Sequence, residues 1–194
     1  MTEPTPNRPR GLDARGRRTL LLITAVAIAP VLVSYAIYYF FPRDAAINYG
    51  TLLPAATAPA IEGTAADGAP FRLGDVKGRW VLVSASDGAC DSACERTLHA
   101  TRQARTMQGK EQDRIVRVWL YAGNAPPPRE LVAQHPGLVV VRVPAASLAE
   151  LPGADRRVWL VDPLGNFVLA YPADPDIKGV AKDLARLLRA SRIG

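Results

Sequence analysis

The chain has 194 residues and a net charge of +6, with 24 lysines and arginines against 18 aspartates and glutamates. Five arginines lie within residues 1–18, so part of the excess belongs to a short N-terminal arm. No basic face suited to nucleic acid is visible in the rest of the chain. Cys90 and Cys94 are the only cysteines, too few for a disulfide-built scaffold or a four-cysteine zinc site. We therefore expect one folded domain and no nucleic-acid partner.

An apolar segment without charged residues follows the arginine-rich arm, from Thr19 to Phe41. As a helix it would be about 34 Å long, enough to cross a bilayer. It is longer than the apolar core of a signal peptide, which favours a retained anchor over a cleaved leader. The basic arm predicts a cytoplasmic N-terminus. The soluble domain would then lie in the periplasm, anchored to the inner membrane, or in a mitochondrial intermembrane space.

The remaining chain divides by composition into a linker at 42–70 and a domain at 71–194. Residues 42–70 are rich in Ala, Pro, Thr and Gly without a sustained period, and we expect them to run off the membrane and drape over the domain at their far end. Apolar runs then predict strands at 80–85, 114–121 and 138–143. Helices are predicted at 91–108 and, briefly, at 129–134. A hairpin at 158–171 precedes an amphipathic helix that Asp174 and Pro175 would start.

The two cysteines lie at the junction of the first core strand and the first long helix. This position predicts an α/β, thioredoxin-like fold, a central mixed sheet with flanking helices, preceded by one transmembrane helix. Cys90 would begin the helix and Cys94 would follow one turn later, so the pair could form a disulfide. The helix dipole favours a thiolate at Cys90, whereas Asp87, Asp91 and Glu95 oppose one. Thiol or metal chemistry is our interpretation, and an inert disulfide is the alternative.

At these residues the chain resembles the Sco/SenC family of membrane-anchored, thioredoxin-like proteins. Cys90, Cys94 and Leu98 match the family motif. The resemblance continues through Gly-Arg-Trp-Val-Leu-Val at 78–83, through 158–167 and through the closing amphipathic helix. It implies a role in copper insertion and cytochrome c oxidase assembly, with an oxidase subunit or a cysteine-bearing copper protein as partner.

The chain also departs from that family's pattern. Asp91 and Glu95 replace the prolines that follow the two family cysteines, and Ser92 takes the place of an aspartate. The family's metal-binding histidine falls near Ala154, where this chain has none. Two thiolates alone can bind Cu(I), while Cu(II) normally needs imidazole. We therefore expect Cu(II) binding to be weak or lost.

Neither histidine of the chain is an obvious substitute ligand. His99 follows Cys94 by five residues on the helix, so it should point away from the sulfurs and lie in solvent or in packing. His135 precedes a strand within Gln-His-Pro-Gly, a sequence typical of a surface turn. Only an unexpected fold would bring His135 to the cysteines.

Three functional hypotheses follow. In the first, the chain assists oxidase assembly as a thiol–disulfide oxidoreductase, with Cys90 attacking and Cys94 resolving. In the second, Cys90 and Cys94 carry Cu(I) as its only ligands. In the third, the domain is an assembly scaffold whose cysteines form a fixed disulfide.

Overall fold

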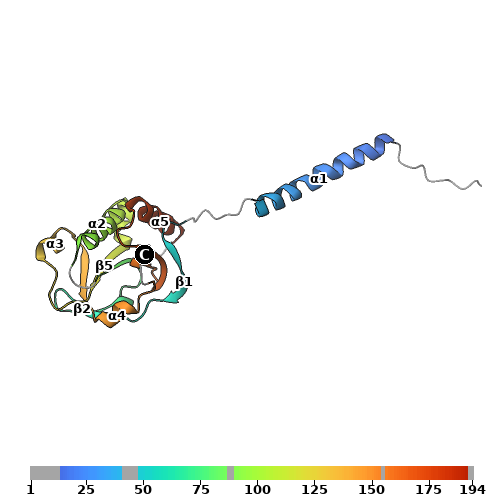
Figure 1. Ribbon diagram of the computed structural model, residues 1–194. Coiled ribbons are helices and arrows are strands. Elements are labelled where there is room, and N and C mark those ends of the chain that lie inside the picture. Colours follow the sequence, from blue (N-terminus) through green and yellow to red (C-terminus); the bar gives the residue numbers. More distant parts are fainter. Residues whose placement is uncertain (1–13, 41–47, 87–89, 154–155, 192–194) are drawn as a thin grey trace, which may run out of the picture. The chain divides into compact units, whose positions relative to one another are not determined.

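The computed structural model describes residues 14–40, 48–86, 90–153 and 156–191, in two compact units divided after Ala46. The first unit contains helix α1 (Ala14–Phe40), which continues through Pro30 (Figure 1). Its window Ala14–Ile37 is long and apolar enough to cross a membrane. The predicted transmembrane segment thus forms a helix, although the helix begins within the basic arm. Residues 1–13 of that arm, and Phe41, lie outside the described part.

The second unit is built on one eight-stranded sheet in the order β1-β8-β7-β4-β5-β6-β2-β3. Strands β4, β5 and β6 are parallel, and the other neighbouring pairs are antiparallel. The prediction of a mixed sheet flanked by helices is confirmed. The strands are β1 (Thr51–Thr57), β2 (Glu62–Ala65), β3 (Pro70–Arg72), β4 (Trp80–Ser86), β5 (Ile115–Tyr121), β6 (Leu138–Arg142), β7 (Arg156–Val161) and β8 (Asn166–Pro172). The helices are α2 (Ser92–Thr106), α3 (Arg129–Ala133), α4 (Ala145–Ala149) and α5 (Ile177–Ala190), with 3-10 turns at Leu73–Asp75 and Gly109–Arg114.

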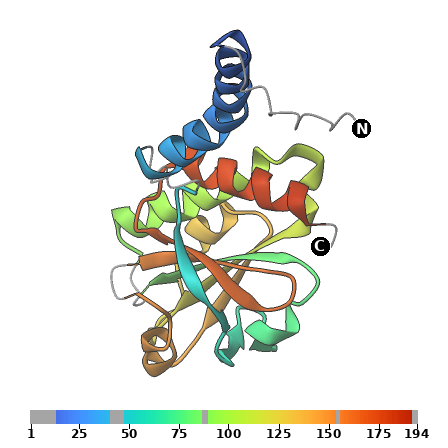
Figure 2. The same ribbon diagram turned by 90° about the vertical axis from the view of Figure 1, so that its right-hand side faces the viewer.

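Helices cover both faces of the sheet, with α2 and α5 on one side and α4 on the other (Figures 1 and 2). Strand β5 shows the consequence for side chains, which alternate between the two faces. Val118 and Leu120 belong to the core on the α4 face. Ile115 and Trp119 belong to the clusters beneath α2 and α5. Because both faces are covered, every residue of β5 is buried, which explains the nearly continuous apolar run that predicted this strand.

The described part of the predicted linker, residues 48–70, contributes two strands and the first residue of a third to the sheet. Strand β1 pairs with β8, and β2 pairs with both β3 and β6. Pro54 falls where the β1–β8 register shifts between Leu52 and Ala56, as expected for a residue without an N–H to donate. Backbone hydrogen bonds to β8 and β6 hold β1 and β2 in the sheet, and the sequences of these short strands show little apolar alternation. The folded unit therefore begins well before residue 71.

The start of this unit is clamped to α5 and β8 by a buried carboxylate. Asp183 is 1% exposed and accepts hydrogen bonds from the backbone N–H groups of Tyr49, at 3.1 Å, and Gly50, at 2.8 Å. The Tyr49 ring stacks on Tyr171 with centroids 5.9 Å apart. The Tyr49 hydroxyl also accepts a hydrogen bond from the backbone N–H of Asp176. We call Asn48–Gly50 and its contacts on Asp183 and Tyr171 the entry clamp.

Helix α5 begins two residues later than predicted. Asp176 is its N-cap, and its carboxylate accepts a 2.7 Å hydrogen bond from the N–H of Gly179. Asp174 instead has a left-handed backbone, with φ of 53°, in the turn before the helix. Aspartate is a common N-cap residue, so either position could have capped the helix. Because Asp174 is part of the turn that follows β8, the helix starts later and Asp176 caps it.

Candidate functional site

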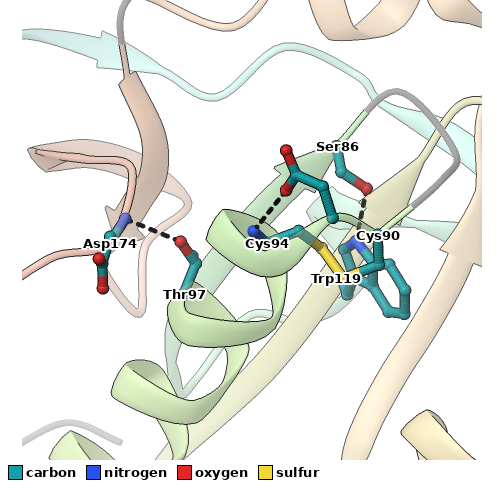
Figure 3. The surroundings of a disulfide bond; sticks show 7 residues. Ser86, Cys90, Cys94, Thr97, Trp119 and Asp174 are labelled. Carbon is teal, nitrogen blue, oxygen red and sulfur yellow. Dashed lines mark hydrogen bonds between the residues drawn. A yellow bond between two sulfur atoms is a disulfide. The ribbon is translucent and has the colours of Figure 1, made fainter.

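Cys90 and Cys94 are joined by a disulfide, with their Cα atoms 5.1 Å apart (Figure 3). Cys94 lies in the first turn of α2, whereas Cys90 lies two residues before the helix and not at its first position. Both residues are half-buried. The two sulfurs, which helix geometry allowed to pair, are thus bonded at a partly exposed position.

Asp91 holds the start of α2 between the two cysteines. It is the N-cap, and its Oδ1 accepts a 2.8 Å hydrogen bond from the N–H of Cys94. This bond stabilises the first helical turn. The carboxylate also brings a negative charge between the two cysteines, which disfavours a thiolate at either of them. Asp87, the other aspartate predicted to oppose a thiolate, lies outside the described residues.

The next turn of α2 is tied to the turn that leaves β8. The hydroxyl of Thr97, a buried residue, accepts a 2.9 Å hydrogen bond from the backbone N–H of Asp174 (Figure 3). Arg96 forms an ion pair with the Asp174 carboxylate at 2.6 Å. Asp174, predicted as a helix cap, thus fixes the orientation of α2 and of the disulfide at its start.

An aromatic side chain lies beneath the disulfide. Cys90 and Cys94 pack against an apolar cluster that includes Trp119 and Leu98. The indole Nε1 of Trp119 donates a 3.0 Å hydrogen bond to the Ser86 hydroxyl, which fixes the ring beside the sulfurs (Figure 3). Cys94 and Trp119 line a small cavity of about 180 Å³. This side of the disulfide therefore leaves room for only a small group.

A larger cleft opens on the Cys90 side, between α2 and α3. Its volume is about 480 Å³. Its lining residues include Cys90, Glu95, His99, Arg102, Leu131 and His135. We refer to it as the α2–α3 cleft. It is the wider of the two approaches to the disulfide.

The placement of His135 corrects the prediction of a surface turn. The residue is only 5% exposed. Its backbone N–H donates to the carbonyl of Val132 at 3.0 Å, and its own carbonyl accepts from Leu138. This tight connection between α3 and β6 folds the imidazole inward. His99 was expected to lie either in solvent or in packing, and it is exposed to solvent. It lines the same cleft as Cys90.

A buried arginine contacts the turn that holds His135. Arg117 of β5 is 2% exposed, and its Nη2 donates to the Pro136 carbonyl at 2.7 Å. Within the described ranges its other two guanidinium nitrogens have no hydrogen-bond partner. Burial, then Arg105 and Arg102, lower the pKa of Arg117 from 12.5 to about 10, so it stays charged at neutral pH. Burial, then Arg102 and Arg117, lower the pKa of His135 from 6.5 to about 4, which keeps its imidazole neutral.

The described residues offer no three-ligand metal site. Over the described ranges, no group of three or more His, Cys, Asp or Glu side chains could hold a metal ion. The position near Ala154, where the Sco/SenC histidine would fall, lies outside those ranges. Cys90 and Cys94 remain the candidate ligands, and only their reduced thiolates could coordinate. Two such thiolates fit Cu(I) better than Cu(II).

Sequence reasoning missed several side chains around the disulfide. Trp119, Arg117 and His135 come from other elements, and nothing in their local sequence marks them as neighbours of the cysteines. Asp91 did carry a signal, because an aspartate three residues before the third helical position is a common capping pattern.

Comparison with known proteins adds to this geometry. Residues 80–191 match a family model described as a transmembrane-like, thioredoxin-like C-terminal domain, and residues 7–40 match the transmembrane-like N-terminal domain. No curated protein matches the sequence significantly.

Solved structures share the fold at low sequence identity. Copper-bound yeast Sco1 is 15% identical with a TM-score of 0.61, covering 72% of this chain and 96% of its own. Copper-bound Arabidopsis thaliana ScoI is 18% identical with a TM-score of 0.55, covering 70% and 100%. The thioredoxin domain of a Bacteroides vulgatus thiol-disulfide oxidoreductase is 18% identical with a TM-score of 0.53, covering 71% and 99%.

Proposed function

Since this chain belongs to the transmembrane-like, thioredoxin-like family, we propose that it is a membrane-anchored thiol–disulfide exchange protein. We further propose that it acts as Sco/SenC proteins do, in assembly of the copper centre of cytochrome c oxidase. The observation that carries the exchange role is the half-buried Cys90–Cys94 disulfide at the start of α2. Structures titled as Sco proteins and as a thiol-disulfide oxidoreductase share the fold and support the proposal.

The exchange proceeds through Cys90. A partner thiolate attacks the Cys90 sulfur, the bond to Cys94 breaks, and Cys94 leaves as a thiolate that takes up a proton. A second partner thiolate then displaces Cys90, so that the partner ends as a disulfide and this chain as a dithiol. The same steps in reverse reduce a partner disulfide. Cys90 is assigned the attacked position because it borders the wider cleft.

Copper enters this proposal as cargo. The reduced Cys90 and Cys94 thiolates would hold Cu(I), a soft ion that two sulfurs can coordinate linearly. A Cu(I)-carrier role through these two residues is therefore the second candidate function, and the disulfide geometry supports it because both sulfurs converge on one point.

The proposed location follows from α1. Its arginine-rich N-terminal flank favours the cytoplasmic side, so the thioredoxin-like unit would lie in the periplasm, tethered to the inner membrane. That compartment permits disulfides, which suits a cysteine pair that cycles between two states.

Redox titration of the full-length chain in detergent tests the exchange role. We expect a dithiol buffer to open the disulfide reversibly, and a Cys94→Ser variant to accumulate a mixed disulfide at Cys90. A matched Cys90→Ser variant should react more slowly, because its remaining thiol, at Cys94, lines the smaller cavity. A disulfide that resists dithiothreitol in the folded chain would contradict exchange and favour the fixed scaffold.

Two further measurements separate the copper and assembly roles. Anaerobic Cu(I) titration should show one equivalent bound by the reduced chain and none by the double variant that carries both Cys90→Ser and Cys94→Ser. Equal binding by the two proteins would reject the carrier role. In cells, the same double variant should leave cytochrome c oxidase deficient in copper. Full oxidase assembly with that variant would contradict any function that depends on the cysteines.

A further inference from the structure

The small cavity beside Cys94 contains a buried hydroxyl group without a partner. Ser84 is 4% exposed and lines this cavity together with Cys94. Its side chain points toward α2, because Ala85, the next residue of β4, packs against the core on the α4 face of the sheet. Within the described ranges the Ser84 hydroxyl forms no hydrogen bond, and its oxygen is open to the cavity rather than enclosed. A buried polar group in this state calls for a partner inside the cavity.

Two more hydroxyl groups line the same cavity and have protons to donate. The Ser86 hydroxyl accepts a hydrogen bond from the Trp119 indole (Figure 3). The Thr97 hydroxyl accepts one from the backbone N–H of Asp174 (Figure 3). Each hydroxyl keeps one O–H donor, and in the described part of the chain neither donates to a protein acceptor. A polar cavity of about 180 Å³ has room for several water molecules.

Water in this cavity connects Ser84 to the sulfur of Cys94. Both residues line the cavity, yet among the described contacts no direct hydrogen bond joins the Ser84 hydroxyl to that sulfur. A water molecule that accepts a hydrogen bond from Ser84 still has both of its own protons, so it can donate one to the sulfur. The hydroxyl would thereby fix the position and orientation of the water.

Two charged side chains also line the cavity. Asp91 and Arg157 act in opposite directions on negative charge at Cys94. Glu95 and Arg96 of the same helix line the α2–α3 cleft instead. Since the Asp91 carboxylate opposes negative charge at the sulfur, donors on the other walls of the cavity are needed to offset it.

We propose that Ser84 positions a water molecule that donates a hydrogen bond to the Cys94 sulfur as the disulfide opens. This inference rests on the proposed exchange function and adds a positioning residue to it. When a partner thiolate attacks Cys90, the electron pair of the Cys90–Cys94 bond moves onto the Cys94 sulfur. The positioned water meets the charge that develops there, as preorganised donors do in other active sites. The thiolate then takes up a proton from solvent.

Three substitutions of Ser84 in the full-length chain in detergent test this role. Ser84→Val and Ser84→Thr introduce side chains of the same shape, and only threonine keeps a hydroxyl; Ser84→Ala removes the hydroxyl without adding bulk. The measurement is the rate at which 2-mercaptoethanol opens the disulfide, with the mixed disulfide trapped by alkylation and quantified by mass. We expect the alanine and valine variants to react about fivefold more slowly than the parent chain, and the threonine variant within about twofold of it.

A serine on the other side of the sheet provides the control. Ser147 is half-buried in α4, and Ser147→Ala should leave the rate of opening unchanged. Urea unfolding of each variant reports whether the unit is still folded when its rate is measured.

Three results would overturn the inference. Equal rates in the parent chain and in all Ser84 variants would refute the role of Ser84 and leave exchange standing. A loss of rate as large with threonine as with valine would show that the shape of the cavity, and not the hydroxyl, controls the reaction. If 2-mercaptoethanol opens the disulfide in none of these proteins, the exchange function fails and the role of Ser84 fails with it.

Discussion

Removing the Asp183 carboxylate should show how strongly the entry clamp holds the folded unit. Asp183→Ala takes away the acceptor for two backbone N–H groups, those of Tyr49 and Gly50, in a place where the side chain is 1% exposed. A hydrogen bond to a charged group contributes about 1.5–3 kcal/mol. The variant should therefore lose about 3–5 kcal/mol of unfolding free energy. For a unit of this size, that corresponds to a fall in Tm of roughly 10 °C.

A milder substitution at Asp183 and a control substitution at the neighbouring residue test this prediction further. Asp183→Asn keeps one carbonyl oxygen and can accept only part of the bonding, so about half of the loss is expected. Lys182→Ala changes the exposed neighbour and should cost less than about 0.5 kcal/mol. Urea unfolding of the full-length chain in detergent, followed by tryptophan emission, measures all three. A loss below about 1 kcal/mol for Asp183→Ala would refute the reasoning that the clamp is part of the cooperative unit.

Three further outcomes are expected. As the pH is lowered from 6.5 to 4, the free energy of unfolding should fall by up to about 1 kcal/mol per pH unit on account of His135. The folded-state pKa of His135 is lowered to about 4, so the unfolded chain binds the extra proton first. A His135→Gln variant that shows the same slope as the parent chain in this range would contradict this prediction. Reduction of the disulfide should raise tryptophan emission, since Trp119 packs beside the sulfurs and a disulfide quenches an adjacent indole; an unchanged rise in Trp119→Phe would assign the signal elsewhere. Gly179→Ala should lower the free energy of unfolding by about 1–3 kcal/mol, because the new Cβ would lie 2.4 Å from the Tyr49 ring. Gly74→Ala, with open space around the new Cβ, should change it little. Equal effects of the two substitutions in urea unfolding would disprove the close approach.

The site was predictable where its chemistry is local in the sequence. Cys90 and Cys94 are four residues apart at a strand–helix junction, so their meeting follows from helix geometry. The surroundings were not predictable in the same way. His135 is buried by the tight α3–β6 connection, a packing result that Gln-His-Pro-Gly, with its turn-forming residues, does not disclose. Residues 51–57 likewise read as loop, because an edge strand can be held by its backbone alone.

The amino-acid sequence by itself determined the anchor, the alternation of strands and helices, and the cysteine pair. Each of these depends on periodicity or spacing within one segment, which hydrophobic burial converts directly into local structure. Tertiary structure alone decided the environment of the sulfurs: Trp119 from β5, Asp174 from the β8–α5 turn, and His135 from beyond α3. These residues are distant in the chain, and only the pairing of strands into one sheet brings them around the start of α2.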